Sequence, residues 1–226
     1  MFINDKIKPM QTLIFTGGNH AEENIIKKYA TDYKHIIAAD SGLDAVNKFK
    51  LIPNYIIGDM DSLKDNRLLA KYKNAKIETH PSDKDFTDTE LALQVASRLG
   101  TEQITLFGGG GSMRMDHLIY FLKVFEIENP PRLWVFDTGL GFCFGSDTDV
   151  KKLYLKPPIK STVSVFNINS KTVFNEPPCI KSKGLHWSLD KVDWKAGGAS
   201  ISNRSDTETI ELTSYTGRFL VLTELY

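Results

Sequence analysis

Short apolar runs alternate with amphipathic segments along the first part of the chain, at residues 12–15, 36–39, 55–57, 75–79, 104–107 and 133–136. Continuous apolar runs of this length are typical of strands that are covered on both faces, as in a parallel sheet. Between two of the runs, Leu91, Val95 and Leu99 recur at helical spacing before Gly100, which predicts a helix with a glycine at its C-terminal cap. Strands that alternate with helices indicate right-handed βαβ units. We therefore expect an α/β fold with a Rossmann-like parallel sheet over residues 1–145.

Residues 146–226 have a different pattern. Val163, Val165 and Ile168 lie in a strand-like segment rich in Thr, Ser and Asn, and no long segment in this half has helical periodicity. This pattern predicts an all-β sandwich domain.

Two local features of this region are also predicted. Residues 208–213 and 218–224 are expected to form two strands joined as a hairpin, because the short connection between them contains Gly217. The segment 138–149, which has three glycines, is expected to link the two domains.

Composition narrows the class of protein. The 28 basic and 28 acidic side chains cancel, so no overall field draws the chain to nucleic acid or to an anionic membrane. Cys143 and Cys179 are the only cysteines, which excludes a disulfide framework and argues against a structural zinc site. The N-terminal residues lack the apolar segment of a signal peptide, and no run approaches the roughly 18 apolar residues of a membrane span. We expect a cytoplasmic protein.

Polar or glycine-rich clusters follow the predicted parallel strands, at residues 17–18, 40–42, 58–62, 80–83 and 108–111. In open α/β sheets, ligands bind at the edge formed by the carboxyl ends of the strands. A single cluster of this kind is often only a helix cap or a turn, but that explanation would have to hold separately for all five clusters. We therefore expect the binding site at this edge.

The sequence GDMDS at residues 58–62 gives the sharpest indication of chemistry. Asp59 and Asp61 are two residues apart on a chain that leaves a buried strand, so their carboxylates can point to the same side. Unpaired carboxylates repel one another, and a divalent cation removes that cost. Oxygen ligands without His or Cys favour magnesium over zinc. The alternative is structural, with Asp59 in a turn and Asp61 or Ser62 as a helix cap.

A second acidic segment covers residues 82–90. Thr87 and Glu90 fit a capping box, so Thr87 is expected to be the N-cap of the next helix. The box does not require Asp88, which would favour the helix dipole and could complete a magnesium site as a third ligand. Lys84 either balances the neighbouring acids or supplies a point charge for a phosphate.

Four glycines at residues 108–111 precede the sequence SMRMDH. Glycines such as Gly109 and Gly110 allow backbone N–H groups to approach a phosphate closely, just before a helix N-terminus. The segment is neither a Walker A loop nor a dinucleotide-binding fingerprint. Arg114 adds a bidentate phosphate donor, and Asp116 could hold Arg114 or His117 in place. The alternative for His117 is a helical surface residue.

Six ordered motifs together resemble those of the thiamine pyrophosphokinase family. They are AADSGLD at 38–44, PNYIIGDMDSL at 53–63, SDKDFTDTELAL at 82–93, RMDH at 114–117 after the glycines, GLHW at 184–187 and ISN at 201–203. The resemblance covers nearly the whole chain, and GDxDS followed by KDxTDxE is the most diagnostic pair. One departure is Ser112-Met113, which stands where the family usually has paired glycines and so bears on how closely that loop approaches phosphate.

The resemblance implies an ATP-binding α/β domain, a β-sandwich domain and a homodimer whose thiamine sites lie between subunits. It implies a reaction in which diphosphate passes from ATP to the hydroxyethyl group of thiamine and AMP is released. By similarity, magnesium is expected at Asp59, Asp61 and Asp88. Phosphate contacts are expected from Lys84 and Arg114, and the nucleotide side is expected to include Asp40 and Ser41. Thiamine is expected to stack on Trp187 and to lie near Ser202 and Asn203.

The expected catalytic residues are Asp61, Asp88 and Arg114, because transfer of this kind depends mostly on positioning and charge stabilisation. Any general base is expected to be a carboxylate of the Asp61 and Asp88 group. Trp187 suits the cationic thiazolium ring through stacking and cation–π attraction. The alternative for Trp187 is a core aromatic of the sandwich.

Two other functions stay open at this point. A different magnesium-dependent kinase or nucleotidyltransferase would use another acceptor. A non-catalytic nucleotide- or thiamine-sensing module would need no intact acidic cluster. An enzyme is favoured because the cluster is complete, with Asp59, Asp61, Asp85 and Asp88.

Overall fold

The computed structural model describes residues 10–60, 67–81, 86–111, 115–168, 176–196 and 198–226. Among these, residues 10–121 and 133–137 form one compact unit, and residues 122–132 and 138–226 form another. The fold is mixed α/β with a mostly parallel sheet and further β-strands, which confirms the predicted class. No helix in the described part of the chain is long and apolar enough to span a membrane.

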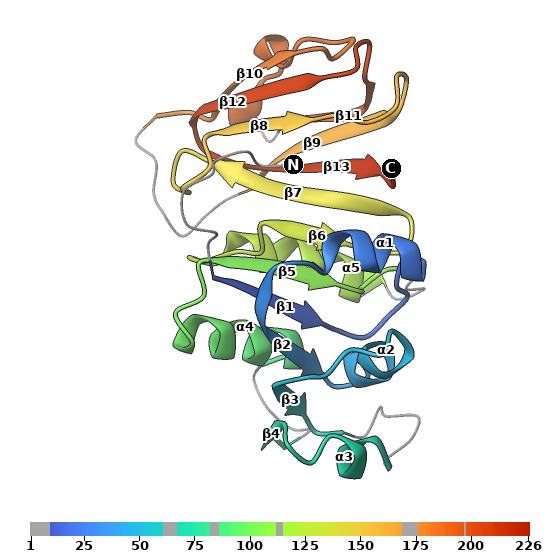
Figure 1. The fold of residues 1–226 in the computed structure, drawn as a ribbon. Coiled ribbons are helices and arrows are strands. Elements are labelled where there is room, and N and C mark those ends of the chain that lie inside the picture. Colours follow the sequence, from blue (N-terminus) through green and yellow to red (C-terminus); the bar gives the residue numbers. More distant parts are fainter. Residues whose placement is uncertain (1–9, 61–66, 82–85, 112–114, 169–175, 197) are drawn as a thin grey trace. The chain divides into compact units, whose positions relative to one another are not determined.

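The first unit is built on a parallel sheet with the strand order β4-β3-β2-β1-β5-β6. All six predicted strands are present: β1 (Gln11–Phe15), β2 (Tyr33–Ala39), β3 (Tyr55–Gly58), β4 (Lys76–Thr79), β5 (Gln103–Phe107) and β6 (Leu133–Val135). Figure 1 shows these strands side by side with their arrowheads pointing the same way. The chain steps outward from β1 to β4 and then returns to β5 on the other side of β1. This change of direction creates a switch point between β1 and β5, where open α/β sheets bind ligands.

In the described part of the chain, five helices connect the strands: α1 (Glu23–Tyr29), α2 (Gly42–Lys48), α3 (Arg67–Lys71), α4 (Asp88–Arg98) and α5 (Met115–Lys123). A 3₁₀ turn, η1 (Val124–Glu126), follows α5. The predicted capping box is confirmed, because Thr87 caps α4 and exchanges hydrogen bonds with Glu90. Leu91 and Val95 are buried, and Gly100 follows the helix with a φ of 68°. Local sequence signals therefore set both ends of α4.

The central strands form the core of this unit, and Leu13, Ile14 and Phe15 of β1 are fully buried. The expectation that every strand is covered on both faces is wrong for β4, whose Ile77 is 41% exposed. The reason is its place in the sheet. β4 pairs only with β3 among the described residues, so as an edge strand it needs no continuous apolar run.

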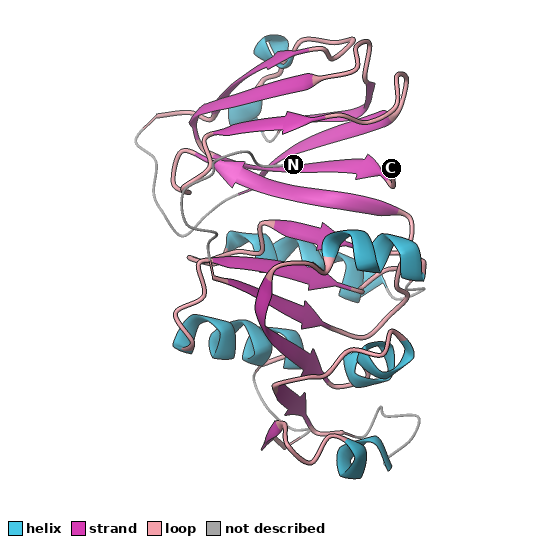
Figure 2. Ribbon diagram, viewed as in Figure 1, coloured by secondary structure: helices cyan, strands magenta, loops and turns pink. Residues whose placement is uncertain are grey.

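The second unit contains two antiparallel sheets, with the orders β11-β9-β13-β7 and β10-β12-β8. The strands are β7 (Gly139–Gly145), β8 (Lys152–Leu155), β9 (Thr162–Ile168), β10 (Cys179–Lys183), β11 (Ala199–Arg204), β12 (Ile210–Thr216) and β13 (Arg218–Glu224). Figure 2 shows this part of the chain mainly as strands, with the short 3₁₀ turns η2 (Leu189–Lys191) and η3 (Trp194–Ala196). We refer to it as the sandwich unit.

Two local predictions for this unit are wrong. The expected linker contains β7, which is buried and pairs with β13 along its whole length. Its glycines therefore belong to a buried strand. The expected hairpin does not form either, because β12 pairs with β10 and β8, whereas β13 pairs with β7 and β9. The chain passes from one sheet to the other at Gly217, whose φ of 94° suits a residue without a side chain.

A buried ion pair stabilises the place where the chain passes from one sheet to the other. The Arg218 side chain is 1% exposed and its Nη2 lies 2.7 Å from Oδ2 of Asp147, which is 5% exposed. Nη1 of Arg218 also donates to the carbonyl oxygen of Phe125 at 2.8 Å. The charge is thus both paired and hydrogen-bonded, as burial requires.

Candidate active site

Three carboxylates meet at the carboxyl edge of the parallel sheet. Asp40 follows β2, Asp59 follows β3, and Asp88 begins α4. Each is partly buried, and each offers one oxygen atom that lies within 4.8 Å of the other two. Carboxylates this close repel one another unless a cation or protons compensate their charge. An all-oxygen set of this kind suits a hard divalent cation such as Mg²⁺.

The backbone around these carboxylates is held in an uncommon conformation. Asp40 has a φ of 48° and Met60, next to Asp59, has a φ of 64°. The Asp40 N–H donates to the carbonyl oxygen of Ile57 at 2.8 Å, which ties the end of β2 to β3. Left-handed non-glycine residues are uncommon and cluster at functional sites. Here Asp40 and Met60 turn the chain sharply at the ends of β2 and β3, next to the carboxylates.

The N-terminus of α4 positions Asp88. Oγ1 of Thr87 accepts from the Glu90 N–H at 3.2 Å, and the Thr87 N–H donates to Oε2 of Glu90 at 2.8 Å. Thr89 lies on the other side of Asp88, and its hydroxyl is 2.7 Å from that of Thr16, which follows β1. The Thr87 hydroxyl also contacts the Tyr120 hydroxyl of α5 at 2.5 Å. Burial raises the pKa of Tyr120, so this contact is between neutral groups at physiological pH.

Several predicted residues fall outside the described part of the chain, namely Asp61, Lys84 and Arg114. Asp59 and Asp88 lie together as predicted for metal ligands. Asp40 was expected only on the nucleotide side, yet the geometry makes it a third candidate ligand. The sequence placed Asp40 after a predicted strand, but only the pairing of β2 with β3 shows that it lies beside Asp59.

The glycine loop and the loop after β1 are hydrogen-bonded to each other. The Gly109 N–H donates to the Gly17 carbonyl at 2.7 Å, and Gly110 and Asn19 exchange backbone hydrogen bonds of 3.3 and 2.8 Å. The Gly108 N–H donates to the carbonyl of Val135 at 3.1 Å. The amides of these three glycines therefore bond to protein carbonyl oxygens in this structure.

Close packing explains why glycine occupies this loop. A Cβ atom on Gly110 would lie 2.0 Å from Oδ1 of Asp137, and one on Gly111 would lie 1.8 Å from Nδ2 of Asn19. Asn19 Nδ2 in turn donates to Oδ2 of Asp137 at 3.4 Å. The glycines thus allow the switch point to close tightly, which is a structural role beside the phosphate contact predicted for Gly109 and Gly110.

Ser41 lies at the same edge. It is the N-cap of α2, but its side chain makes no capping hydrogen bond. Its hydroxyl instead lies over Gly17, where a Cβ atom would come within 2.5 Å of Oγ. Ser41 therefore lies against the loop that follows β1, and Asp40 lies at the end of β2.

His20 is a residue of this region that sequence reasoning missed. Its ring stacks on Phe15 with centroids 6.2 Å apart, and its buried Nε2 atom has no hydrogen-bond partner among the described residues. Burial lowers the pKa of His20 to about 4, and the Lys48 charge acts in the same direction. His20 is thus a neutral, packed imidazole at the switch point.

The first turn of α5 carries the other predicted residues of the glycine-loop motif. Asp116 and His117 are both exposed. For His117 this agrees with the alternative of a surface residue, although exposure is equally compatible with contact to a ligand.

In the sandwich unit, Trp187 is 55% exposed, so it is not a core aromatic. Asn203, by contrast, is fully buried. Ser202 is exposed with a φ of 56°, and its N–H donates to Oγ of Ser164 at 3.1 Å. The three residues predicted to contact thiamine therefore lie on one unit, but their side chains differ in access to solvent.

A charged network that the sequence did not suggest lies on one side of Trp187. The Arg204 guanidinium lies over the indole ring, 5.4 Å from its centroid. Nη2 of Arg204 lies 2.9 Å from Nε2 of His186, and Nδ1 of His186 lies 2.8 Å from Oδ2 of Asp206. Because arginine can only donate, Nε2 of His186 accepts and Nδ1 carries the proton. This network orients the indole from one face.

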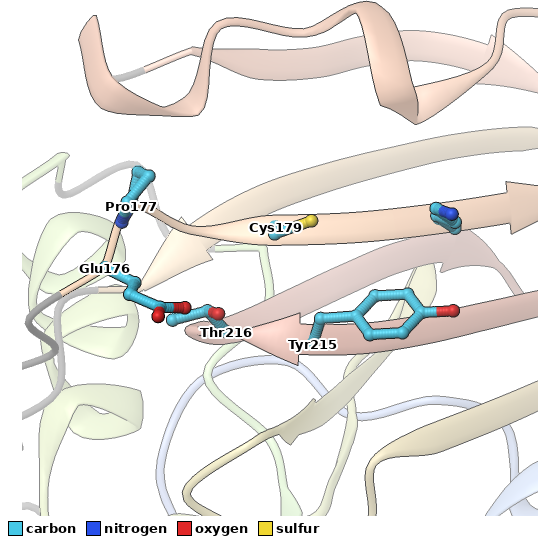
Figure 3. Close-up of a pocket in the computed structure, with 6 residues that line it drawn as sticks. Glu176, Pro177, Cys179, Tyr215 and Thr216 are labelled. Atoms are coloured by element: carbon cyan, nitrogen blue, oxygen red, sulfur yellow. The ribbon is translucent and has the colours of Figure 1, made fainter.

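A hollow elsewhere on the sandwich unit has a different lining. It is formed by Glu176, Pro177, Cys179, Lys181, Tyr215 and Thr216. Figure 3 shows Cys179 and Tyr215 on neighbouring strands at this hollow. It contains none of the predicted site residues, so we take the carboxylate cluster as the candidate active site.

A family model matches the part of the chain that carries the three carboxylates. Residues 26–133 match the sequence profile described as thiamin pyrophosphokinase, catalytic domain, which spans Asp40, Asp59 and Asp88. No curated protein matched the chain. The family resemblance drawn from the motifs is thus confirmed for this segment.

Solved structures of thiamin pyrophosphokinases have the same fold. The Bacillus subtilis structure has a TM-score of 0.74 and 17% identity, and the match covers 96% of this chain and 99% of that one. The Geobacillus thermodenitrificans structure has a TM-score of 0.71 and 19% identity, covering 96% and 98%. The Candida albicans structure has a TM-score of 0.67 and 17% identity, covering 96% and 90%. At these identities the likeness shows the fold alone.

Proposed function

We propose that this chain, which carries a thiamin pyrophosphokinase catalytic domain in residues 26–133, transfers diphosphate from ATP to thiamine with Mg²⁺ as cofactor. The observation that carries the proposal is the convergence of Asp40, Asp59 and Asp88 within 4.8 Å in the matched domain. The carboxylates fit a magnesium ion in number, charge and donor type. We place the protein in the cytoplasm.

In the proposed reaction, the hydroxyl oxygen of thiamine attacks the β-phosphorus of ATP. The bond between that phosphorus and the oxygen bridging to the α-phosphate breaks, and AMP leaves with the electron pair. The hydroxyl proton passes to a carboxylate of the Asp61 and Asp88 group or to solvent. The products are thiamine diphosphate and AMP.

The chain's own residues would supply position and charge. Asp40, Asp59, Asp61 and Asp88 would hold the metal, which when bound neutralises charge on the phosphate oxygens. Lys84 and Arg114 would contact phosphate oxygens, and Arg114 would stabilise charge that develops during transfer. Ser41, the glycine loop with Gly109 and Gly110, and the α5 residues Asp116 and His117 would line the nucleotide side.

The acceptor would bind at Trp187, whose half-exposed indole offers an aromatic face to a cationic ring. Ser202 would lie beside it. Asn203 would act on the acceptor through Trp187. We further propose a homodimer in which these residues complete the site of the partner subunit.

Identification of both products tests the function. Purified protein with ATP, Mg²⁺ and thiamine should yield AMP and thiamine diphosphate in equal amounts, and EDTA should abolish both. Release of ADP, or turnover only with another acceptor, would instead indicate a different magnesium-dependent kinase or nucleotidyltransferase. Binding of ATP or thiamine without any turnover would indicate a sensing module.

Subunit mixing tests the shared site. Asp61→Asn should be inactive alone, and Trp187→Ala should have little activity at a thiamine concentration near the wild-type KM. Exchange between them should restore activity at that concentration in a fraction of heterodimers. Recovery requires that the two residues of one site come from different chains. Heterodimers that form without recovery would reject the shared site and leave the reaction itself untouched.

A further inference from the structure

We propose that Tyr120 is a positioning residue for the metal site, because its hydroxyl ties α5 to the N-cap of α4 and so fixes Asp88 within the carboxylate cluster. The proposal rests on the proposed function only in taking Asp88 as a ligand for the cation. Nothing in the motifs singled out Tyr120.

The contact between α5 and α4 is made at the hydroxyl of Thr87. Besides its contact with Tyr120 at 2.5 Å, Oγ1 of Thr87 lies 3.0 Å from Oε2 of Glu90 and accepts from the Glu90 N–H. The capping box would satisfy α4 without any contribution from α5. The additional contact with Tyr120 therefore locates the capped helix end rather than forming it.

A second tether acts on the other side of Asp88. The hydroxyls of Thr89 and Thr16 are 2.7 Å apart, and both residues are only 6% exposed. This bond holds the first turn of α4 against the end of β1. Asp88 thus lies between two tethered neighbours, one held by β1 and the other by α5.

The α5 end of the tie is itself well anchored. Phe121, next to Tyr120, stacks on Trp134 with centroids 5.4 Å apart and an interplanar angle of 8°. The indole N–H of Trp134 donates to the Gly108 carbonyl at 2.8 Å. The helix that carries Tyr120 is therefore fixed to the glycine loop. Through the Tyr120 hydroxyl, the separation between that loop and Asp88 is fixed as well.

Loss of this hydroxyl should weaken cation binding without unfolding the chain. Tyr120→Phe keeps the ring and its packing, and it leaves the capping box in place. We expect the dissociation constant for Mn²⁺ to rise about threefold to tenfold, as for loss of one hydrogen bond. The readout is the electron paramagnetic resonance signal of free Mn²⁺, measured on the whole protein without turnover, with Mg²⁺ as competitor.

Tyr72→Phe is the matched control. Its hydroxyl donates to Oδ1 of Asn47 at 3.2 Å, so the same atom is lost from a bond between α2 and the end of α3. We expect Mn²⁺ affinity equal to wild type. Equal weakening by Tyr72→Phe and Tyr120→Phe would show a general effect on stability and overturn the proposal.

A double-mutant comparison separates positioning from packing. Thr87→Ser keeps the hydroxyl and should bind Mn²⁺ like wild type. In a Thr87→Val background the Tyr120→Phe change should have a much smaller effect than in the wild type, because both changes remove the contact between these two hydroxyls. A full additional effect in that background would overturn the proposal.

Asp88→Asn distinguishes this inference from the proposed function. If Asp88→Asn weakens Mn²⁺ binding and Tyr120→Phe does not, the metal assignment stands and the role of Tyr120 is rejected. If Asp88→Asn binds Mn²⁺ like wild type, the metal assignment fails and the role of Tyr120 fails with it.

Discussion

The side-chain amide of Asn203 holds Trp187 by its backbone on both sides. Oδ1 of Asn203 accepts from the Trp187 N–H at 3.1 Å, and Nδ2 donates to the Trp187 carbonyl at 2.8 Å. Nδ2 also donates to Oγ of Ser200, and Oδ1 also accepts from the Arg204 N–H. Both donors and both acceptor positions of the amide are therefore used within the protein. Any effect of Asn203 on a ligand therefore passes through these neighbours, of which Trp187 is the predicted ligand contact.

Asn203→Asp should test that relationship. The change is nearly isosteric, but it replaces the Nδ2 donors with an oxygen that faces the Trp187 carbonyl. We expect the KM for thiamine to rise about tenfold or more, while the KM for ATP changes little. The measurement is steady-state kinetics with each substrate varied in turn.

Asn167→Asp is the control for this change, because Nδ2 of Asn167 donates to the Arg218 carbonyl at 3.1 Å in the same unit. It should lower thermal stability without a selective rise in the thiamine KM. If both variants raise that KM equally, the Asn203 effect is one of general destabilisation.

The exposure of Trp187 leads to a second prediction. Trp187→Ala should raise the KM for thiamine far more than that for ATP, because it removes an aromatic surface from the acceptor alone. It should lower Tm only slightly, since the side chain is 55% exposed. Trp194→Ala should behave in the opposite way, with a large fall in Tm, because Trp194 is 6% exposed. A large loss of stability in Trp187→Ala would contradict a binding role.

Sequence reasoning succeeded where one local signal decides the structure. The six apolar runs, the Thr87 and Glu90 box and Gly100 each act over a few residues, and all were predicted. It failed for β7 and for the supposed hairpin, because the pairing of β13 with β7 and β9 joins segments far apart in the chain. A glycine between two strand-like segments does not reveal whether those strands share a sheet.

The candidate site likewise combines residues that local motifs predicted with residues that only the three-dimensional structure identifies. Asp59 and Asp88 were predicted from motifs, but the addition of Asp40 depends on the order of β2 and β3 in the sheet. His20 and Tyr120 belong to no motif, and their importance comes only from which side chains surround them. Asn203 was predicted as a site residue, although its burial and its bonds to Trp187 are visible only in three dimensions.

The carboxylate cluster predicts different effects of one substitution on the free and metal-bound protein. Asp59→Asn removes one negative charge from a group whose oxygens lie within 4.8 Å of one another, so the metal-free protein should keep its Tm nearly unchanged. The increase in Tm that Mg²⁺ produces in the wild type should be largely lost, because ligand-linked stabilisation depends on affinity. Thermal unfolding with EDTA and with excess Mg²⁺ measures both. Asp190→Asn, on the sandwich unit, should respond to Mg²⁺ like wild type.

His20 predicts how stability depends on pH. Its pKa in the folded chain is about 4, against 6.5 for the ordinary value, so the unfolded chain binds the proton more readily. The neutral form stabilises the fold fully above pH 6.5, and this contribution is lost as pH falls toward 4. The total is roughly 3 kcal/mol at about 1.4 kcal/mol per pH unit. Urea unfolding at pH 7.5 and pH 4.5 should show a smaller pH-dependent loss for His20→Gln than for wild type.

The buried ion pair of the sandwich unit gives the last prediction. Arg218→Ala would leave the Asp147 carboxylate buried and unpaired, and it would remove the donor to the Phe125 carbonyl. Breaking one half of such a pair costs about 3–5 kcal/mol, so urea unfolding should show a large loss of stability. Lys27→Ala is the matched control, because it breaks the pair between Lys27 and Glu23, whose side chains are 68% and 52% exposed, and it should leave stability unchanged. Replacing both partners, as Arg218→Met with Asp147→Leu, should recover much of the loss, since no charge is then buried alone. If the double variant is no more stable than Arg218→Ala, the cost lies in the lost packing and the lost bond to Phe125 rather than in the unpaired carboxylate.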